Sequence, residues 1–219
     1  MLVSLIDILF PRMCVFCDTQ KTLLCDECKN TKLDYYKTHF CHVCHKDCAE
    51  ELVHRECQKN SDLNGVIVVA HYNKFAKILI EEMKYNLYFS ISAEIGYLMK
   101  NKLLDFDIQY DVIVPVPLHR FKENYRGFNQ AELLSKVITS KVDNCLKRTK
   151  NTKSQVNLNR KERLANLKDV FQLKKEICYK SVLLVDDVMT SGSTLEECAK
   201  VLRKGGVEKV YGLVFARGD

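Results

Sequence analysis

After about residue 63 the apolar positions of the chain alternate between two kinds of spacing. Short apolar runs, typical of buried strands, are separated by stretches in which apolar residues recur every three or four positions, as on one face of a helix. The pattern predicts strands over residues 65–72, 110–117, 181–187 and 209–217 and helices over residues 75–85, 129–140 and 194–204. Because strands that alternate with helices form right-handed units, we expect an α/β fold with an open parallel sheet.

The sequence also indicates the buried face of one predicted helix and the end of another. In the helix over residues 75–85, the spacing places Phe75, Ile78, Leu79 and Met83 on the buried face. Gly205 and Gly206 end the helix over residues 194–204.

The strand over residues 181–187 ends in two adjacent acids. Residues 182–185 form an unbroken apolar run, as in a central strand covered on both faces, and Asp186 and Asp187 follow directly. Ligands of open α/β sheets bind at the carboxyl ends of the strands. We therefore expect the functional groups of the protein after Val114 and after Val185.

The residues that follow the acids favour a phosphate ligand. They are Thr190, Ser191, Gly192, Ser193 and Thr194. Hydroxyl groups and backbone N–H groups at the start of a helix bind phosphate, and glycine lets the backbone approach it closely. Carboxylates beside a phosphate bind sugar hydroxyls or Mg²⁺. The stretch therefore predicts a site for a phosphorylated ribose presented with magnesium, whereas the two commonest phosphate motifs, G-x4-G-K-[ST] and G-x-G-x-x-G, are missing.

Cysteines divide the chain into two parts, because eight of the eleven lie before residue 58. Two C-x2-C pairs supply four thiolates for a structural zinc ion: Cys14, Cys17, Cys25 and Cys28. A second zinc ion would use Cys41 and Cys44 with two further ligands. His54 and Cys57 repeat the same spacing and are the preferred pair, with Cys48 as the competitor. We expect a small double zinc ribbon over residues 1–62, with a short helix over residues 2–10, and a second domain over residues 63–219.

Charge is distributed unevenly along the chain, which has a formal net charge of +6. Residues 1–60 hold eight bases and nine acids, whereas residues 141–180 hold twelve bases and four acids. The basic segment is either a solvated loop or a binding surface for a diphosphate or a nucleic acid backbone. The apolar run over residues 2–10 is too short to span a bilayer and lacks the features of a secretion signal, so we expect a cytoplasmic protein without a transmembrane segment.

A family resemblance adds to these expectations. The stretch VLLVDDVMTSGST, residues 182–194, resembles the phosphoribosyl pyrophosphate signature of type I phosphoribosyltransferases. VPVPLHR, YRGFNQAELLS and GLVFAR, behind a cysteine-rich region, narrow the resemblance to the ComF family of competence proteins. The resemblance implies a type I phosphoribosyltransferase fold behind a zinc ribbon.

The same resemblance implies roles for individual residues. Asp186 and Asp187 would be the catalytic acids that hold the ribose hydroxyls, and residues 190–194 would hold the 5-phosphate. The turn that contains Pro115, Val116 and Pro117 would face the diphosphate. A flexible loop carrying Arg120, Lys122 and Arg126 would close over it, with Lys84 as a further candidate.

Three functions stay open at this point. The preferred one is a protein of DNA uptake that binds phosphoribosyl pyrophosphate with magnesium and handles incoming single-stranded DNA. The second is a phosphoribosyltransferase of nucleotide salvage, which releases diphosphate. The third is a non-catalytic zinc scaffold that docks a helicase or a DNA-uptake channel protein. Whether the protein is an enzyme is left open by the sequence.

Overall fold

The computed structural model of the protein describes residues 12–48, 52–85, 89–150 and 170–218. The expected helix over residues 2–10 and the middle of the basic segment, residues 151–169, lie outside the described residues. None of the helices in the described part of the chain is long and apolar enough to cross a membrane.

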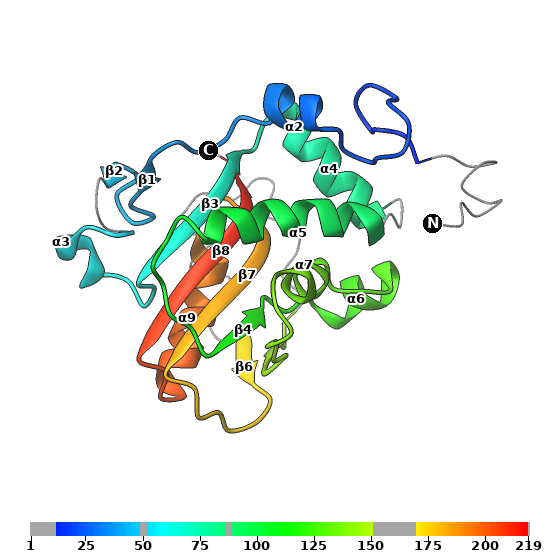
Figure 1. Cartoon of the computed structure of the whole chain (residues 1–219). Helices are drawn as coiled ribbons and strands as arrows, with labels where there is room; N and C mark the ends of the chain where they lie inside the picture. Colours follow the sequence, from blue (N-terminus) through cyan, green and yellow to red (C-terminus); the bar gives the residue numbers. More distant parts are fainter. Residues whose placement is uncertain (1–11, 49–51, 86–88, 151–169, 219) are drawn as a thin grey trace.

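A four-stranded sheet forms the centre of the molecule (Figure 1). Its strands are β3 (Gly65–His71), β4 (Val112–Pro115), β7 (Ser181–Met189) and β8 (Lys209–Arg217). They pair in the order β3-β8-β7-β4, and every pair is parallel. Near-continuous burial of these strands explains their apolar composition, because helices or further chain cover both faces of the sheet. The predicted open parallel sheet is confirmed.

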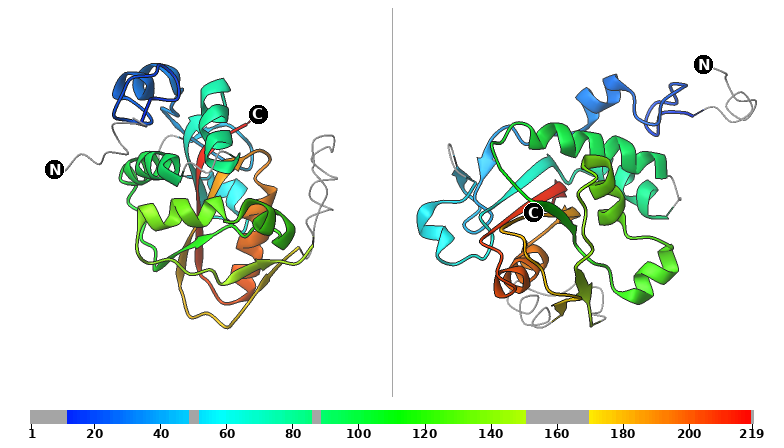
Figure 2. Two further views of the ribbon diagram at one scale, coloured as in Figure 1. Left: turned by 90° about the vertical axis from the view of Figure 1, so that its right-hand side faces the viewer. Right: turned by 60° about the horizontal axis from the view of Figure 1, so that its bottom comes forward.

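Helices cover one face of the sheet. They are α4 (Lys74–Tyr85), α5 (Phe89–Leu103) and α7 (Gln130–Ile138). On the opposite face lies α9 (Ser193–Lys204), beside a hairpin of β5 (Leu146–Arg148) and β6 (Phe171–Leu173). The left view of Figure 2 shows α5 and α9 on opposite sides of the sheet. The predicted helices α4, α7 and α9 are present, and α5 is a further helix that was not expected from the sequence pattern.

The buried face of α4 differs from the expected one. Leu79 and Met83 are buried as predicted, but Phe75 is only half-buried, and Ala76 and Ile80 are buried beside them. Ile78 is half-buried as well. The helix is rotated from the expected orientation, because it packs against α5 as well as over the sheet.

Two elements near the acids also differ from the expectation. β7 continues past the acids to Met189, because Val188 and Met189 still pair with β8. The expected flexible loop contains α6 (Arg120–Arg126). His119 caps its first turn by accepting a hydrogen bond from the Phe121 N–H, and Gly127, at φ 82°, ends it in the left-handed conformation.

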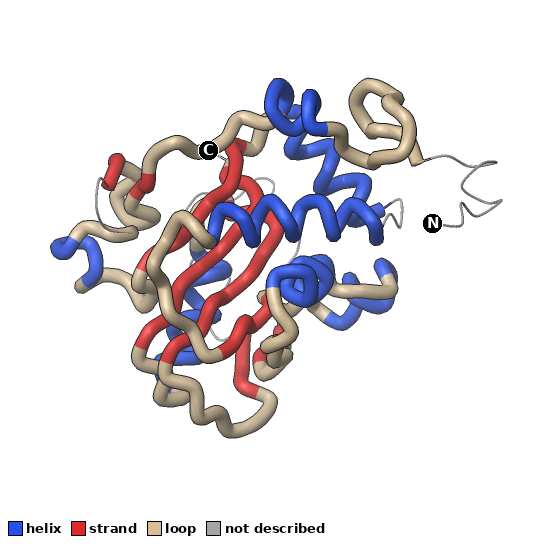
Figure 3. The backbone as a smooth tube through the Cα atoms, viewed as in Figure 1, coloured by secondary structure: helices blue, strands red, loops and turns tan. Residues whose placement is uncertain are grey.

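The cysteine-rich region packs on the α/β core in two separate parts. The first part contains α2 (Asp26–Lys32) and lies against α4, whereas the second contains β1 (His39–Phe40), β2 (Asp47–Cys48) and α3 (Arg55–Gln58) (Figure 1). Most of this region is loop (Figure 3). Between the parts, the backbone of residues 34–36 hydrogen-bonds to β3 at 2.8 and 3.0 Å and covers that edge of the sheet.

Candidate functional site

The two adjacent acids of β7 point to opposite faces of the sheet. Side chains alternate along a strand, so Asp187 shares the face of Val185 that α4 and α7 cover. Asp186 shares the face of Leu184, on the side of α9 and the β5–β6 hairpin. Both acids lie near the carboxyl end of β7, where the sequence analysis expects the functional groups.

Asp187 is buried within a chain of polar groups. Its carboxylate forms an ion pair with Lys84 at the end of α4 and accepts a hydrogen bond of 2.8 Å from the Gln130 side chain. Arg126 donates in turn to the Gln130 side-chain oxygen. The structure thus pairs Lys84 with Asp187 directly and connects Arg126 to the same acid through Gln130. Gln130 was missed by the sequence analysis, although its place directly after the Asn129 helix cap was a usable signal.

Neighbouring charges separate the pKa values of the two acids. Burial alone would raise the pKa of Asp187, but the Lys84 ammonium outweighs it and lowers that pKa. Burial, together with the charge of Asp187, raises the pKa of Asp186 well above its usual range. Burial would lower the pKa of Lys84, yet Asp187 raises it. Asp187 is therefore the ionised member of the pair, and Asp186 holds its proton more tightly.

The loop between β7 and α9 has the geometry of an anion site. Gly192 has φ 75° and caps α9, and the hydroxyl oxygens of Ser191 and Ser193 lie 2.7 Å apart. The first N–H groups of a helix have no acceptor within the helix, and they carry partial positive charge. Thr190 is exposed and Thr194 is half-buried at the same helix end. These five residues, all expected from the sequence, lie together at one end of α9.

The end of β4 is held beside β7. The Val116 N–H donates to the Val185 carbonyl at 2.9 Å, and the Asn129 side chain donates to the Val116 carbonyl at 3.0 Å. Pro115 is buried as the last residue of β4, and Pro117 is half-buried.

Beyond Pro117 lies a cavity of about 490 Å³, bordered by Arg120, Lys147 and Arg148 among others. Burial, followed by the charges of Arg148, Arg126 and Lys84, lowers the pKa of Lys122. Lys122 therefore lies near other cations, and a polyanion bound among them would relieve their mutual repulsion.

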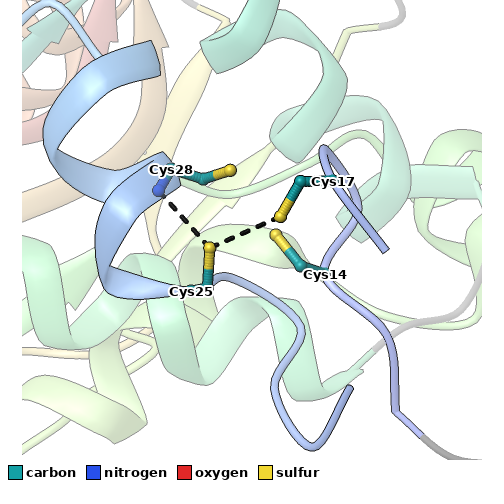
Figure 4. Close-up of side chains that lie close together, drawn as sticks. All are labelled: Cys14, Cys17, Cys25 and Cys28. Atoms are coloured by element: carbon teal, nitrogen blue, oxygen red, sulfur yellow. Dashed lines mark hydrogen bonds between the residues drawn. The ribbon is translucent and has the colours of Figure 1, made fainter. Parts of the chain in front are cut away.

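The first cysteine cluster contains all four predicted ligands. The sulfur atoms of Cys14, Cys17, Cys25 and Cys28 lie within 4.8 Å of one another (Figure 4). Hydrogen bonds from the side chain and backbone of Thr19 lower the pKa of Cys17 to about 6, which favours the thiolate that binds zinc. The arrangement fits a closed, structural zinc site.

The second cluster contains His54 instead of Cys48. Cys41, Cys44, His54 and Cys57 lie with their ligand atoms within 4.8 Å of one another. In the neutral His54 ring, the Nε2–H donates to the Asp47 carbonyl at 3.1 Å, so Nδ1, which lies 3.3 Å from the Cys44 sulfur, carries the lone pair that can bind zinc. Such a carbonyl partner fixes the tautomer of a zinc-binding histidine. Cys48, on β2, packs in the small core beside this cluster.

A contact that the sequence does not indicate joins the second cluster to the phosphate-type loop. Glu196, in the first turn of α9, accepts hydrogen bonds from the Ser61 hydroxyl at 2.9 Å and the Asp62 N–H at 2.5 Å. His42, next to the ligand Cys41, bonds to the Ser61 hydroxyl at 2.8 Å. His42, Ser61 and Glu196 border a cavity of about 150 Å³ together with residues 191–193.

Comparison with known proteins agrees with this architecture. Residues 87–218 match the phosphoribosyl transferase domain family, and residues 5–58 match the double zinc ribbon domain family. Competence protein F of Haemophilus influenzae is 36% identical over 207 residues, which cover 88% of this chain and 84% of the relative. DNA utilization protein YhgH of Escherichia coli K12 is 30% identical over 70% of this chain and 72% of its own length.

Competence protein ComFC of Bacillus subtilis is 27% identical over 89% of this chain and 84% of the relative. The matches to competence protein F and ComFC therefore extend across both the cysteine-rich region and the parallel sheet. The chain belongs to the family of competence protein F and ComFC, with a double zinc ribbon and a type I phosphoribosyl transferase domain in one chain.

Proposed function

We propose that the protein binds phosphoribosyl pyrophosphate with Mg²⁺ at the carboxyl edge of its sheet, as part of a role in DNA uptake. The observation that carries the proposal is the placement of Asp186 and Asp187 between the loop of Gly192 and the cations of α4 and α6. A ribose with a phosphate at one end and a diphosphate at the other matches this order of groups.

Each part of the ligand has a complementary part of the chain. The N–H groups and hydroxyls of residues 190–194 would hold the 5-phosphate. Asp186 and Asp187 would accept hydrogen bonds from the ribose hydroxyls. The turn of residues 115–117 would face the diphosphate, and Lys122 and Arg126 would neutralise its charge. α6, which carries both cations and has no buried residue, would close over the ligand.

Magnesium fits the oxygen donors of this site. Mg²⁺ binds carboxylate oxygens, keeps several of its waters and also binds phosphate groups. Asp186 is the half-buried acid with the raised pKa, so a cation beside it would favour release of its proton. When bound, the metal would offset negative charge on the diphosphate. The ion pair between Lys84 and Asp187 would leave Asp186 as the available carboxylate.

The role in DNA uptake rests on the relatives. Two of them are named competence proteins and another a DNA utilization protein. We infer that this protein acts on incoming single-stranded DNA inside the cell. Lys147, which borders the cavity at the end of β4, and Lys150 are exposed in the basic segment and would contact a phosphate backbone. A helicase or uptake channel is the corresponding protein partner.

Transfer of the phosphoribosyl group is a second candidate, because the cations converge where a leaving diphosphate would lie. An acceptor would form a bond to the anomeric carbon as the carbon–oxygen bond to diphosphate breaks, and the diphosphate would leave with the bonding electrons. Release of diphosphate that depends on an added purine, pyrimidine or amide would reveal a salvage enzyme. A scaffold would show neither turnover nor DNA binding.

Calorimetric titration of phosphoribosyl pyrophosphate with Mg²⁺ tests the ligand. We expect the zinc-loaded protein to bind, and we expect the Asp186→Asn, Asp187→Asn double variant to lose binding while it keeps its circular dichroism spectrum. Asp105→Asn, which changes an acid at the end of α5, should bind as the unchanged protein does. Absence of binding by the folded wild type would contradict the proposal.

A further inference from the structure

Aromatic side chains gather on the surface around α6, the end of α4 and the start of α5. We call this the aromatic patch and define it as Tyr85, Phe89, Phe121, Tyr125 and Phe128. Four of them are strongly exposed: Tyr125 is 89% exposed, Phe121 73%, Tyr85 63% and Phe89 54%. Scattered exposed apolar residues are ordinary, but a group on neighbouring elements indicates a binding surface.

Two contacts link the rings on α4 and α5 to the chain at and after the end of α6. The Arg126 guanidinium lies 5.5 Å from the centre of the Tyr85 ring, and the rings of Phe89 and Phe128 lie 5.2 Å apart. These contacts connect α6 and the residues after it to the end of α4 and the start of α5. Figure 1 shows α6 next to this end of α5.

Within the patch, α6 presents an apolar face to solvent. Phe121 and Tyr125 are four residues apart, so they lie on the same side of the helix, and none of the residues of α6 is buried. His119 stacks on Phe121 with ring centres 5.6 Å apart. Since the packing of an amphipathic face supplies most of the stability of short helices, this face indicates a partner that covers it.

The charges around the patch indicate a nucleic acid. Arg120 is exposed directly before Phe121, Lys122 is exposed between the two aromatic residues, and Arg126 ends the helix. Single strands are bound by such interleaved cations and rings, since the cations contact the phosphates and the rings stack on the bases. Rings this exposed suit a flexible polymer with many bases more than a free base, which binds in an enclosed pocket.

The basic segment does not supply these rings among its described residues. Phe171 is buried in the core, and the Tyr179 hydroxyl donates to Asp143 at 2.9 Å. Both rings therefore have structural partners. A DNA single strand that contacts Lys147 would therefore need a stacking surface outside the basic segment. Arg120 of α6 borders the same cavity at the end of β4 as Lys147 does, so α6 lies close to such a strand.

We propose that the aromatic patch is a stacking surface for the bases of single-stranded DNA, with Phe121 and Tyr125 as its principal contacts. The inference rests on the proposed DNA-handling role and assigns DNA binding to a defined surface of the protein. Arg126 contacts both Tyr85 in the patch and Gln130, the partner of Asp187. The strand would therefore pass directly beside the ribose-phosphate site.

Two oligonucleotides separate stacking from backbone contacts. One is fluorescein-labelled (dT)20 and the other is an abasic strand of equal length and charge, each titrated with the full-length protein by fluorescence anisotropy. We expect (dT)20 to bind more tightly than the abasic strand. The Phe121→Leu, Tyr125→Leu double variant should weaken (dT)20 binding by roughly ten- to a hundredfold and leave abasic binding unchanged. Tyr97→Leu, another exposed ring on α5, is the matched control.

Titration of the same double variant with phosphoribosyl pyrophosphate distinguishes this inference from the proposed function. We expect its affinity for that ligand to stay close to the wild-type level, because Lys122 and Arg126, the two α6 residues assigned to the diphosphate, are unchanged. Loss of phosphoribosyl pyrophosphate binding with normal (dT)20 binding would show that the rings belong to a lid, and would overturn the inference. Equal binding of (dT)20 and the abasic strand by the wild type would overturn it as well, whatever the result with phosphoribosyl pyrophosphate.

Discussion

At the residue scale, the opposite orientation of Asp186 and Asp187 decides their electrostatics. Two adjacent residues of a strand cannot face the same side, so Asp187 lies against Lys84 while Asp186 faces the side of Arg148. The two acids do not repel each other strongly, because Asp187 forms an ion pair with Lys84 and Asp186 keeps its proton. The two acids therefore have opposite effects on stability as the pH changes.

For the single variants we expect opposite pH dependences. Asp186 has a folded pKa above its usual value of 3.8, so the wild type loses stability as pH rises from 3.8 through that folded pKa. Asp186→Asn should therefore be more stable than wild type at pH 7, and the gap should narrow toward pH 4. Asp187 has a lowered pKa, so Asp187→Asn should be less stable at pH 7 and lose this deficit below pH 3.8. Urea unfolding between pH 3 and 8 measures the free energy of unfolding of both variants. A difference from the wild type that stays constant with pH, for either variant, would contradict the assigned direction of that acid's pKa.

At the element scale, the two helices at the site differ in how firmly they are held. α9 buries Leu195, Ala199 and Leu202 against the sheet, whereas α6 buries none of its residues. The loop that α9 presents is accordingly fixed, and the cations of α6 are carried by a marginal helix. The fixed helix end suits the 5-phosphate, and the marginal helix suits a part that moves.

The glycines at the two ends of α9 provide a matched test of the loop. Gly192 has φ 75° and Gly206 has φ 95°, and a side chain at either position is strained by about 1 to 2 kcal/mol. We expect Gly192→Ala and Gly206→Ala to lower the free energy of unfolding by similar amounts, as measured in urea. Only Gly192→Ala should weaken phosphoribosyl pyrophosphate binding, measured by calorimetry. Equal affinities of the two variants for phosphoribosyl pyrophosphate would show that the loop of Gly192 does not contact this ligand.

The elements also show what the sequence could predict. β3, β7 and β8 are visible as apolar runs because both faces of the sheet are buried, and the acids and the loop after them are adjacent in the chain. α5 was not visible, because its packing depends on contacts distant in sequence. A side chain at Gly96 would meet Val137 of α7 at 2.6 Å, so the glycine permits close helix packing that no local pattern indicates.

Contacts between distant segments likewise explain the partners that were missed. Gln130 and Asp187 are 57 residues apart, and Ser61 and Glu196 are 135 residues apart. Only the fold brings each pair together. The zinc ligands were predictable because each cluster is assembled from nearby residues. Spacing already favoured His54 over Cys48, and the structure adds the Asp47 carbonyl that orients the His54 ring.

At the scale of the whole molecule, the zinc clusters hold different parts of the core. The first packs over α4, and the second is tied through Ser61 to Glu196 at the start of α9. Structural zinc stabilises the fold around it because its ligands are not assembled in the unfolded chain. The second cluster should therefore support the phosphate-type loop, and the first should not.

A pair of variants compares the two clusters. Cys17→Ser and Cys44→Ser should each lose one of two zinc ions, as counted by native mass spectrometry. We expect Cys44→Ser to weaken phosphoribosyl pyrophosphate binding severalfold in calorimetry, because Glu196 loses its ordered partners. Cys17→Ser should retain the affinity of the wild type. Equal weakening in both variants would show a general effect of zinc loss rather than support of the loop.

The strand order has a consequence for how the protein is synthesised. β8 lies inside the sheet between β3 and β7, yet it follows both of them in the chain. While the chain is still on the ribosome, β3 has left the exit tunnel long before its inner neighbour is translated. The sheet, and with it the site at its edge, can form only when translation has passed β8, so any nascent chain shorter than this leaves β3 without its parallel partner.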